Sequence, residues 1–396
     1  MKGYEILFGV CIFLVFYTYI GYGILLYILV KIKKLYNNTI APTPLCEDKL
    51  PEVTLFIAAY NEESVINRKM NNCLELDYPL NKLHILWITD GSNDNTNEAL
   101  SHWKQATVIF QPERQGKTAA LNRGMKYVNS PIVVFTDANT SLNREALRVI
   151  VQAFNNPKVG CVAGEKRIAV KKKDNAASGG EDLYWKYEST LKSLDSQLCS
   201  VVGAAGELFA IRRDLYEAMK PDTLLDDFMI SLRIAMRGYK IEYCADAYAI
   251  ESGSINMEEE EKRKIRITAG GLQSIWRLRS LLNPFKFGCL SFQYISHRVL
   301  RWSVTPIALF LLFPINIILV AGLQSPLYII LLALQLIFYS MGVGGYILSK
   351  KHIKNKLLFV PYYFLFMNVN VIKGAIYLFK RRNSGNGIWE KAHRAD

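Results

Sequence analysis

Paired cysteines are missing from this 396-residue sequence. Its seven cysteines are scattered along the chain, and none forms a Cys-x-x-Cys pair. Their odd number and wide spacing argue against a zinc knuckle and against a framework of disulfides. The sequence therefore indicates a chain that works in a reducing compartment.

A complete phosphate-binding P-loop is also missing. Gly116, Lys117 and Thr118 match the end of that motif, but Gln111 stands where the motif needs its first glycine. Lys117 remains a candidate for phosphate contact at a loop-to-helix junction, and a solvated lysine fits the spacing equally well. The net charge is +13, but the basic residues form no stripe with interleaved aromatics. We therefore predict no nucleic-acid partner.

Charge is absent from residues 6–30, which are apolar and long enough to span a bilayer. The stretch lacks the small-residue cleavage site of a signal peptide, and Lys31, Lys33 and Lys34 follow it directly. Such lysines mark the cytoplasmic end of a spanning helix and attract anionic lipids. We predict a permanent anchor over residues 1–31, a linker with Pro42 and Pro44, and a cytoplasmic domain on a multi-pass inner or plasma membrane protein.

The C-terminal part is again apolar. We predict an amphipathic segment on the membrane surface over residues 257–298. A membrane region follows over residues 299–380, with two spans over residues 299–322 and 327–348, and a tail covers residues 381–396. Residues 357–379 are long enough to span but contain Asn368, Asn370 and Lys373. Spanning, interfacial and re-entrant placements of this stretch therefore stay open.

Residues 52–256 have a different pattern, in which short apolar runs alternate with polar, helix-compatible segments. The runs cover residues 53–58, 83–89, 107–110 and 132–136. This alternation predicts a doubly wound, Rossmann-like α/β domain. Ligands of such sheets bind beyond the carboxyl ends of the strands, so the polar residues there are the candidates for chemistry.

The first two runs end in residues suited to a nucleotide. Ala59, Tyr60, Asn61 and Glu62 follow the first run, although Asn61 or Glu62 would also suit a helix cap. Asp90 ends the second run before a glycine turn, and we predict that it contacts a base or ribose.

Two further sites carry oxygen ligands. Asp137 and Asn139 follow the fourth run, where they could share a divalent cation that neutralises a diphosphate; a plain turn explains them equally well. Asp226 and Asp227 open a predicted helix, where carboxylates either interact with the helix dipole or face the pocket as a base. Between these sites, a glycine-rich loop that begins at Gly203 permits close backbone approach to a ligand.

In this order, the pieces resemble the inverting family 2 glycosyltransferases of the cellulose, hyaluronan and poly-N-acetylglucosamine synthase group. The resemblance covers nearly the whole chain. It implies a GT-A fold, hexosyltransferase activity, a nucleotide-sugar donor, usually of UDP, and Mg2+ or Mn2+. It implies the following roles: Asp227 as general base beside Asp226; donor contacts from Ala59, Tyr60, Asn61, Glu62, Asp90, Lys117, Asp137 and Arg266; metal ligands Asp137 and Asn139; and an acceptor side with Gly203, Gly206, Glu207 and Trp185.

The sequence departs from the family pattern in three places. Asn139 replaces an aspartate, and Asp226 replaces a glutamate. The Gln-x-x-Arg-Trp motif aligns with residues 263–267, where Arg266 is kept but the glutamine and tryptophan are lost. In the family that tryptophan helps to hold a growing polymer. Single transfer to a lipid-linked or saccharide acceptor in surface-polysaccharide assembly is therefore predicted first; processive synthesis and a non-catalytic nucleotide-binding scaffold stay open.

Overall fold

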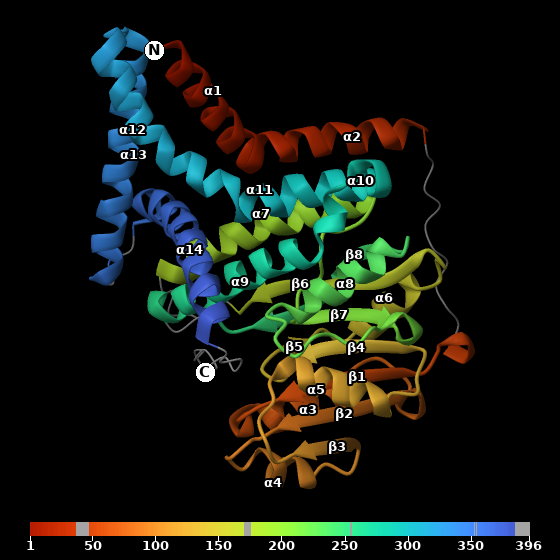
Figure 1. Ribbon diagram of the computed structural model, residues 1–396. Coiled ribbons are helices and arrows are strands. Elements are labelled where there is room, and N and C mark those ends of the chain that lie inside the picture. The colour runs from red at the N-terminus through yellow and green to blue at the C-terminus, as the bar shows by residue number, and fades with distance from the viewer. Residues whose placement is uncertain (37–46, 170–175, 254–255, 352, 354, 385–396) are drawn as a thin grey trace.

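The computed structural model describes residues 1–36, 47–169, 176–253, 256–351, 353 and 355–384. An α/β domain forms the lower part of the molecule in the view of Figure 1, and long helices from both ends of the chain lie above it and to its left. The predicted linker prolines Pro42 and Pro44 lie outside the described residues, as does the predicted tail beyond residue 384.

An eight-stranded mixed sheet runs through this domain in the order β3-β2-β1-β4-β7-β6-β8-β5. Strands β3, β2, β1 and β4 are parallel, and they confirm the four predicted apolar runs. The bounds are β1 (Val53–Ala59), β2 (Leu83–Asp90), β3 (Ala106–Gln111), β4 (Ile132–Asp137), β5 (Ser141–Leu142), β6 (Val159–Ile168), β7 (Leu208–Arg212) and β8 (Lys240–Glu251).

The second half of the sheet departs from the parallel pattern. β7 runs antiparallel to both β4 and β6, whereas β8 is parallel to β6. The start of β7 therefore lies beside the end of β4, where Thr136 pairs with Leu208. This reversal brings the loop before β7 to the same sheet edge as the residues that follow β4.

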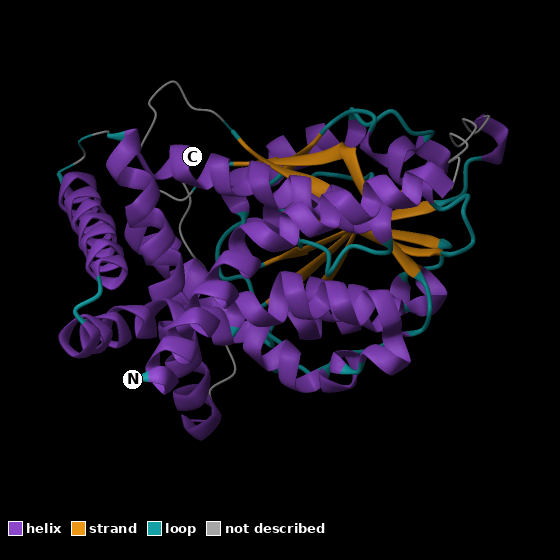
Figure 2. Ribbon diagram, turned by 90° about the horizontal axis from the view of Figure 1, so that it is seen from above, coloured by secondary structure: helices purple, strands orange, loops and turns teal. Residues whose placement is uncertain are grey.

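Helices cover both faces of the sheet, as the view from above shows (Figure 2). Along β1, Leu55 and Ile57 pack in one apolar core and Phe56 in the other. Burial on both faces explains why the parallel strands read as continuous apolar runs. The first core includes α3 (Ile66–Leu74), α4 (Thr96–Ser101) and α6 (Ala146–Ala153), and the second includes α5 (Lys117–Gly124), α8 (Asp226–Met236) and α10 (Pro284–Tyr294).

The first apolar stretch is bent rather than a single straight helix. α1 (Lys2–Phe16) and α2 (Tyr22–Tyr36) flank a π-helical turn, Tyr17–Gly21, where the ribbon changes direction (Figure 1). α1 packs on α12 (Val304–Leu323), whereas α2 lies along α7 (Ala176–Leu198), with Tyr22 and Leu26 against Leu191. The expected anchor is thus divided between the helical bundle and the α/β domain.

Among the residues that the structure describes, four helical stretches are long and apolar enough to cross a membrane: Lys2–Tyr36, Val304–Leu323, Pro326–Lys350 and Leu357–Lys380. The last two belong to α13 (Pro326–Lys350) and α14 (Lys356–Ser384). The stretch left open by the sequence is therefore a continuous helix of spanning length. α13 and α14 meet closely, because a Cβ atom at Gly345 would lie 2.3 Å from the carbonyl oxygen of Leu358.

α9 (Met257–Arg277) joins the α/β domain to these helices. Its charged side chains Glu260, Arg263 and Lys264 are buried. α14 packs along this helix, where the Lys373 ammonium pairs with the Glu261 carboxylate. The polar face that predicted a surface helix is thus turned inward, toward a cavity. The short helix α11 (Leu300–Trp302) completes that region.

Candidate functional site

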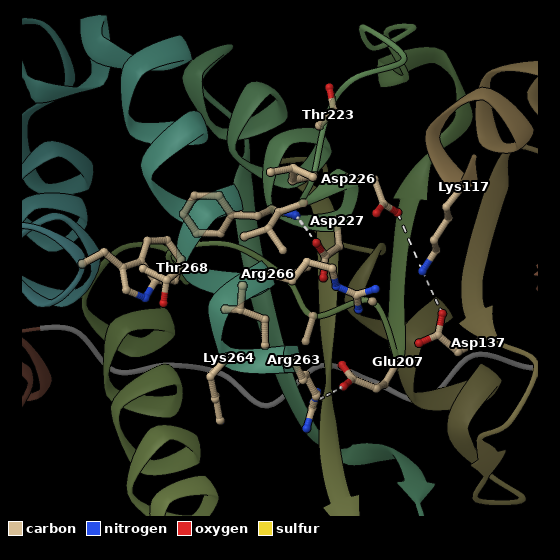
Figure 3. Close-up of a pocket in the computed structure, with 18 of the residues that line it drawn as sticks. Lys117, Asp137, Glu207, Thr223, Asp226, Asp227, Arg263, Lys264, Arg266 and Thr268 are labelled. Carbon is tan, nitrogen blue, oxygen red and sulfur yellow. Dashed lines mark hydrogen bonds and ion pairs between the residues drawn. The ribbon is translucent and has the colours of Figure 1, made fainter. Parts of the chain in front are cut away.

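One cavity of about 660 Å³ lies at the sheet edge where β4 and β7 meet (Figure 3). Asn61 and Gly203 are the two predicted site residues that do not line it. The predicted residues that do line it are Ala59, Tyr60, Glu62, Asp90, Lys117, Asp137, Asn139, Trp185, Gly206, Glu207, Asp226, Asp227 and Arg266.

The antiparallel pairing of β7 with β4 explains the convergence. The Thr136 hydroxyl donates a hydrogen bond to the carbonyl oxygen of Glu207, at 3.1 Å, which fixes the loop before β7 beside Asp137. Gly206 in that loop leaves little space: a Cβ atom there would lie 3.2 Å from the Asp227 Oδ2 and 3.5 Å from the Lys117 Nζ. Three segments far apart in the sequence thus meet at one point.

Lys117 joins the two acidic sites. Its ammonium lies 2.8 Å from the Asp137 Oδ1 and 3.9 Å from the Asp226 Oδ2 (Figure 3). Desolvation of this half-exposed side chain disfavours its charge, but the carboxylates of Asp137 and Asp226 outweigh that effect and raise the pKa of Lys117. Lys117 is therefore charged at neutral pH, lies between the carboxylates of Asp137 and Asp226, and can bind a phosphate group.

Asp227 is the carboxyl group with the most unusual environment. Burial, followed by the adjacent charge of Asp226, raises the pKa of Asp227 to about 7. Its Oδ1 accepts a hydrogen bond of 2.8 Å from the backbone N–H of Phe228. A carboxylate with a pKa near neutrality suits general base catalysis.

Asp226 does not cap the helix that it opens. The N-cap position of α8 is Leu225, and the Asp226 side chain turns toward Lys117 instead. Asp226 is 8% exposed, and its Oδ2 has no hydrogen-bond partner among the residues that the structure describes. A buried acceptor without a donor is costly, so this oxygen marks a place for a ligand group or water.

The turns after β1 and β2 form the donor end. The Asp90 Oδ2 accepts hydrogen bonds from the backbone N–H groups of Gln115, at 3.0 Å, and Gly116, at 2.6 Å. Asp90 thus holds the loop that carries Lys117, in addition to lining the cavity. The Arg114 guanidinium stacks 3.7 Å from the centre of the Tyr60 ring, which makes a flat cationic surface.

Asn61 has a structural task. It adopts a positive φ of 53°, and its Nδ2 donates to the Asn93 Oδ1 at 2.7 Å, so it ties the β1 turn to the β2 turn outside the cavity. Gly203 is also structural. Its φ is 86°, and a Cβ atom there would lie 2.2 Å from the Phe228 ring. Glu62 is the N-cap residue of the following helical turn but makes no side-chain cap hydrogen bond there.

α9 supplies the basic side of the site. The Arg263 guanidinium lies 3.3 Å from the Glu207 Oε1, which the Lys166 ammonium also approaches, at 2.5 Å. Burial, and then the charge of Arg263, lower the pKa of the Arg266 guanidinium. Arg266 lines the cavity near the acidic residues, where an anionic leaving group would relieve the repulsion from Arg263.

Several cavity residues were not predicted. Lys192 of α7, Arg298 of a second π-helical turn (Ile295–Val299), and Arg301 and Trp302 of α11 all line the cavity. Arg301 lay inside the predicted span over residues 299–322, and an ionisable residue inside such a span is itself a functional signal. The structure begins α12 at Val304, so Arg301 stands before the apolar helix.

The described residues contain no group of three histidine, cysteine or acidic side chains that would hold a metal alone. Asp137 and Asn139 nevertheless lie on one turn and line the cavity. Mg2+ sites commonly use one or two carboxylates with substrate phosphates and water as the remaining ligands. The donor set therefore fits a divalent cation that arrives with a diphosphate.

Comparison with known proteins relates the α/β domain to a family of enzymes. Residues 54–219 match the family model "Glycosyl transferase family 2". A poly-beta-1,6-N-acetyl-D-glucosamine synthase of Staphylococcus aureus (strain COL) is 28% identical over 206 residues, 50% of this chain and 48% of that protein. A probable glycosyltransferase of Bacillus subtilis (strain 168), YdaM, is 27% identical over 211 residues, 49% of each protein. The chain thus matches about half the length of these relatives.

A solved structure extends the likeness in fold. The mannosyltransferase PcManGT of Pyrobaculum calidifontis, in complex with GDP-Man and Mn2+, has a TM-score of 0.70 and 24% identity, over 94% of this chain and 99% of that one. The likeness supports the expected GT-A fold with apolar helices at both ends. Residues 54–219, which carry Asp90, Lys117 and Asp137, thus match a glycosyl transferase family 2 domain, and the relatives of this segment are consistent with a family 2 synthase-like group.

Proposed function

We propose that this chain is a membrane-bound inverting glycosyltransferase, which moves a hexose from a nucleotide sugar to an acceptor hydroxyl. The observation that carries the proposal is the convergence of Asp137 and Asp227 on one cavity, with Lys117 between the two acidic sites. Donor-side and acceptor-side groups thus face one volume, which in-line displacement requires.

In the proposed reaction, the acceptor oxygen attacks the anomeric carbon as the bond to the nucleoside diphosphate breaks. Asp227 accepts the proton of the acceptor hydroxyl. Arg266 and Lys117 stabilise the charge that develops on the leaving diphosphate. Asp137 and Asn139 would hold Mg2+ or Mn2+, which supplies further charge neutralisation when bound.

We infer that the enzyme works at the cytoplasmic face of the membrane. Lys33 is the most informative of the three lysines at the end of the first apolar stretch. Its ammonium donates hydrogen bonds to the carbonyl oxygens of Gln197, at 3.0 Å, and Leu198, at 2.7 Å, at the end of α7. A lysine at the cytoplasmic end of the predicted anchor thus also fixes the α/β domain against it.

The base assignment is tested by Asp227→Asn in the full chain. We expect the variant to bind nucleotide as the wild type does but to transfer sugar at least about a hundredfold more slowly, as for loss of a general base. A screen of UDP and GDP sugars with Mg2+ and with Mn2+ first identifies the donor. Asp246→Asn, an exposed carboxylate outside the cavity, is the matched control. Near-native turnover by Asp227→Asn would refute the assignment.

Repeated addition to a polymer is the second candidate. It is favoured by the similarity to the poly-beta-1,6-N-acetyl-D-glucosamine synthase and by Trp302, which lines the cavity although the family tryptophan position is Ile267. Gly271 of α9 admits this ring, because a Cβ atom there would lie 2.4 Å from it. The length of the product made with a labelled donor separates the two: one added sugar supports single transfer, and a ladder supports polymerisation.

A further inference from the structure

The far wall of the cavity is built from an apolar helix of spanning length. The lining residues of α14 recur every three or four positions, so they share one helix face. They are Val360, Tyr363, Phe364, Met367, Asn368 and Val371. A site for a water-soluble sugar acceptor alone has no need of such a wall.

The bend in the first apolar helix completes this wall. Tyr19 lies in the π-helical turn and lines the cavity. Its ring packs edge-on against Phe364, with the ring centres 4.8 Å apart, and its hydroxyl donates to the Asn368 Oδ1 at 2.6 Å. Two candidate membrane spans, α14 and the bent N-terminal helix, therefore line one end of the cavity.

A cationic zone lines the cavity between this wall and the acidic centre. Arg298 and Arg301 both contact the buried Glu188, at 2.5 and 2.9 Å, and Lys192 lies on the same helix as Glu188. Glu165, which accepts a hydrogen bond of 3.0 Å from the Ser189 hydroxyl, is a second carboxylate near Lys192, so three cations here face two carboxylates. The His297 ring also neighbours the Glu188 carboxylate, and it is itself paired with Asp195 at 2.6 Å.

Lys192 is the most telling of these cations. It is 4% exposed, yet among the described residues it makes no hydrogen bond and no ion pair; its ammonium lies 5.8 Å from the centre of the Trp185 ring. Burial lowers the pKa of Lys192. An unpaired buried ammonium is costly, and a phosphate group beside it would offset that cost and favour its charged form.

We propose that the acceptor is an amphiphile: a hydroxyl-bearing sugar joined through a phosphate to a hydrocarbon chain. The phosphate pairs with Lys192 near Trp185, and the chain leaves along α14 past Tyr19. This inference rests on the proposed function and names its acceptor class. The hydroxyl is required because Asp227 must receive a proton: the acceptor O–H breaks, the new C–O bond forms, and the electron pair of the old bond leaves on the nucleoside diphosphate.

Binding of decyl phosphate to the full chain in neutral-lipid nanodiscs tests this inference without any transfer step. We expect decyl phosphate to displace radiolabelled decyl phosphate at least about tenfold better than the neutral decyl maltoside, since hydrogen bonds to charged groups are of that magnitude. Inorganic phosphate, which has the same head without the chain, should compete far less well. Equal competition by decyl maltoside, or by inorganic phosphate, would overturn the proposal.

Substitution at Lys192 gives the second arm. Lys192→Met should weaken decyl phosphate binding about tenfold or more, Lys192→Arg should preserve it, and Lys126→Met, at an exposed lysine outside the cavity, should leave it unchanged. Unaltered affinity in a folded Lys192→Met protein contradicts the proposal. If that variant does not fold, the wild-type competition decides. Failure of the proposed function would be seen differently: the protein would turn over no nucleotide sugar, whether or not it binds decyl phosphate.

Discussion

Two aspartates near the start of α8 sit in opposite electrostatic environments. Burial and Asp226 raise the pKa of Asp227 to about 7, whereas at Asp222 the ion pair with Arg277 outweighs partial burial and lowers the pKa. A raised carboxyl pKa means that the fold favours the protonated form. Its stabilising effect is complete below the unfolded value of 3.8 and is lost as the pH rises through about 7.

Asp227→Asn should therefore raise the thermal unfolding midpoint at pH 8, because the amide stays neutral where the wild-type carboxyl must ionise. The gain should shrink toward zero between pH 7 and pH 4. Differential scanning fluorimetry across that range measures it. Asp222→Asn provides the contrast and should lower the midpoint slightly at pH 8, since it removes an ion pair of 2.6 Å with Arg277. A lower midpoint for Asp227→Asn at pH 8 would count against the burial described for this carboxyl group.

The same carboxyl group predicts the pH dependence of transfer. The base form of Asp227 is needed, and its pKa is about 7, so kcat/KM should rise tenfold per pH unit below that value and level off above it. Initial rates with saturating metal and a neutral donor sugar would show this limb. A profile that is flat between pH 5 and pH 8 would exclude Asp227 as the titrating base.

Lys117 should influence metal and nucleotide in opposite directions. Its ammonium lies 2.8 Å from the Asp137 Oδ1, so Lys117→Met should strengthen Mn2+ binding in the absence of nucleotide and weaken binding of a nucleoside diphosphate. Isothermal titration calorimetry with each ligand separates the two effects. Lys126→Met, remote from the cavity, should change neither affinity. Weaker Mn2+ binding in Lys117→Met would show that Asp137 is not the metal ligand.

At the scale of single elements, α13 and α14 depend on small residues where they meet. A Cβ atom at Gly345 would lie 2.3 Å from a backbone oxygen of α14, whereas one at Gly344 would lie 3.7 Å from the flexible Leu358 side chain. Gly345→Ala should therefore lower the unfolding midpoint by several degrees in detergent, and Gly344→Ala should not. Equal midpoints would mean that α14 does not pack against α13 in this way.

The parallel strands were predictable from sequence because burial on both faces produces uninterrupted apolar runs, as along β1. The antiparallel β7 was not, since strand direction depends on pairing with β4 and not on local pattern. The bend at Tyr17–Gly21 was also missed, because the whole stretch is uniformly apolar. Periodicity reports burial but carries little information on direction or curvature.

In the site, residues at strand ends were found because topology places them at one edge of the sheet, and Asp90 and Asp137 are examples. Lys192, Arg298 and the α14 face were missed for a physical reason: they reach the cavity only through packing of α7, the Ile295–Val299 turn and α14 around it. Asn61 was assigned to the donor through the family resemblance; in the structure its side chain bridges two turns and does not line the cavity.

At the scale of the whole molecule, the proposed reaction requires donor, base and acceptor groups to share one cavity between the sheet and the apolar helices of spanning length. A cryo-electron microscopy structure of the full chain in nanodiscs, with a hydrolysis-resistant form of the accepted donor and Mn2+, tests this most directly. We predict diphosphate oxygens within metal-coordination distance of Asp137 and Asn139, and the anomeric carbon turned toward Asp227 on the face opposite the leaving group. A nucleotide bound outside this cavity, or an anomeric carbon shielded from Asp227, would contradict the account.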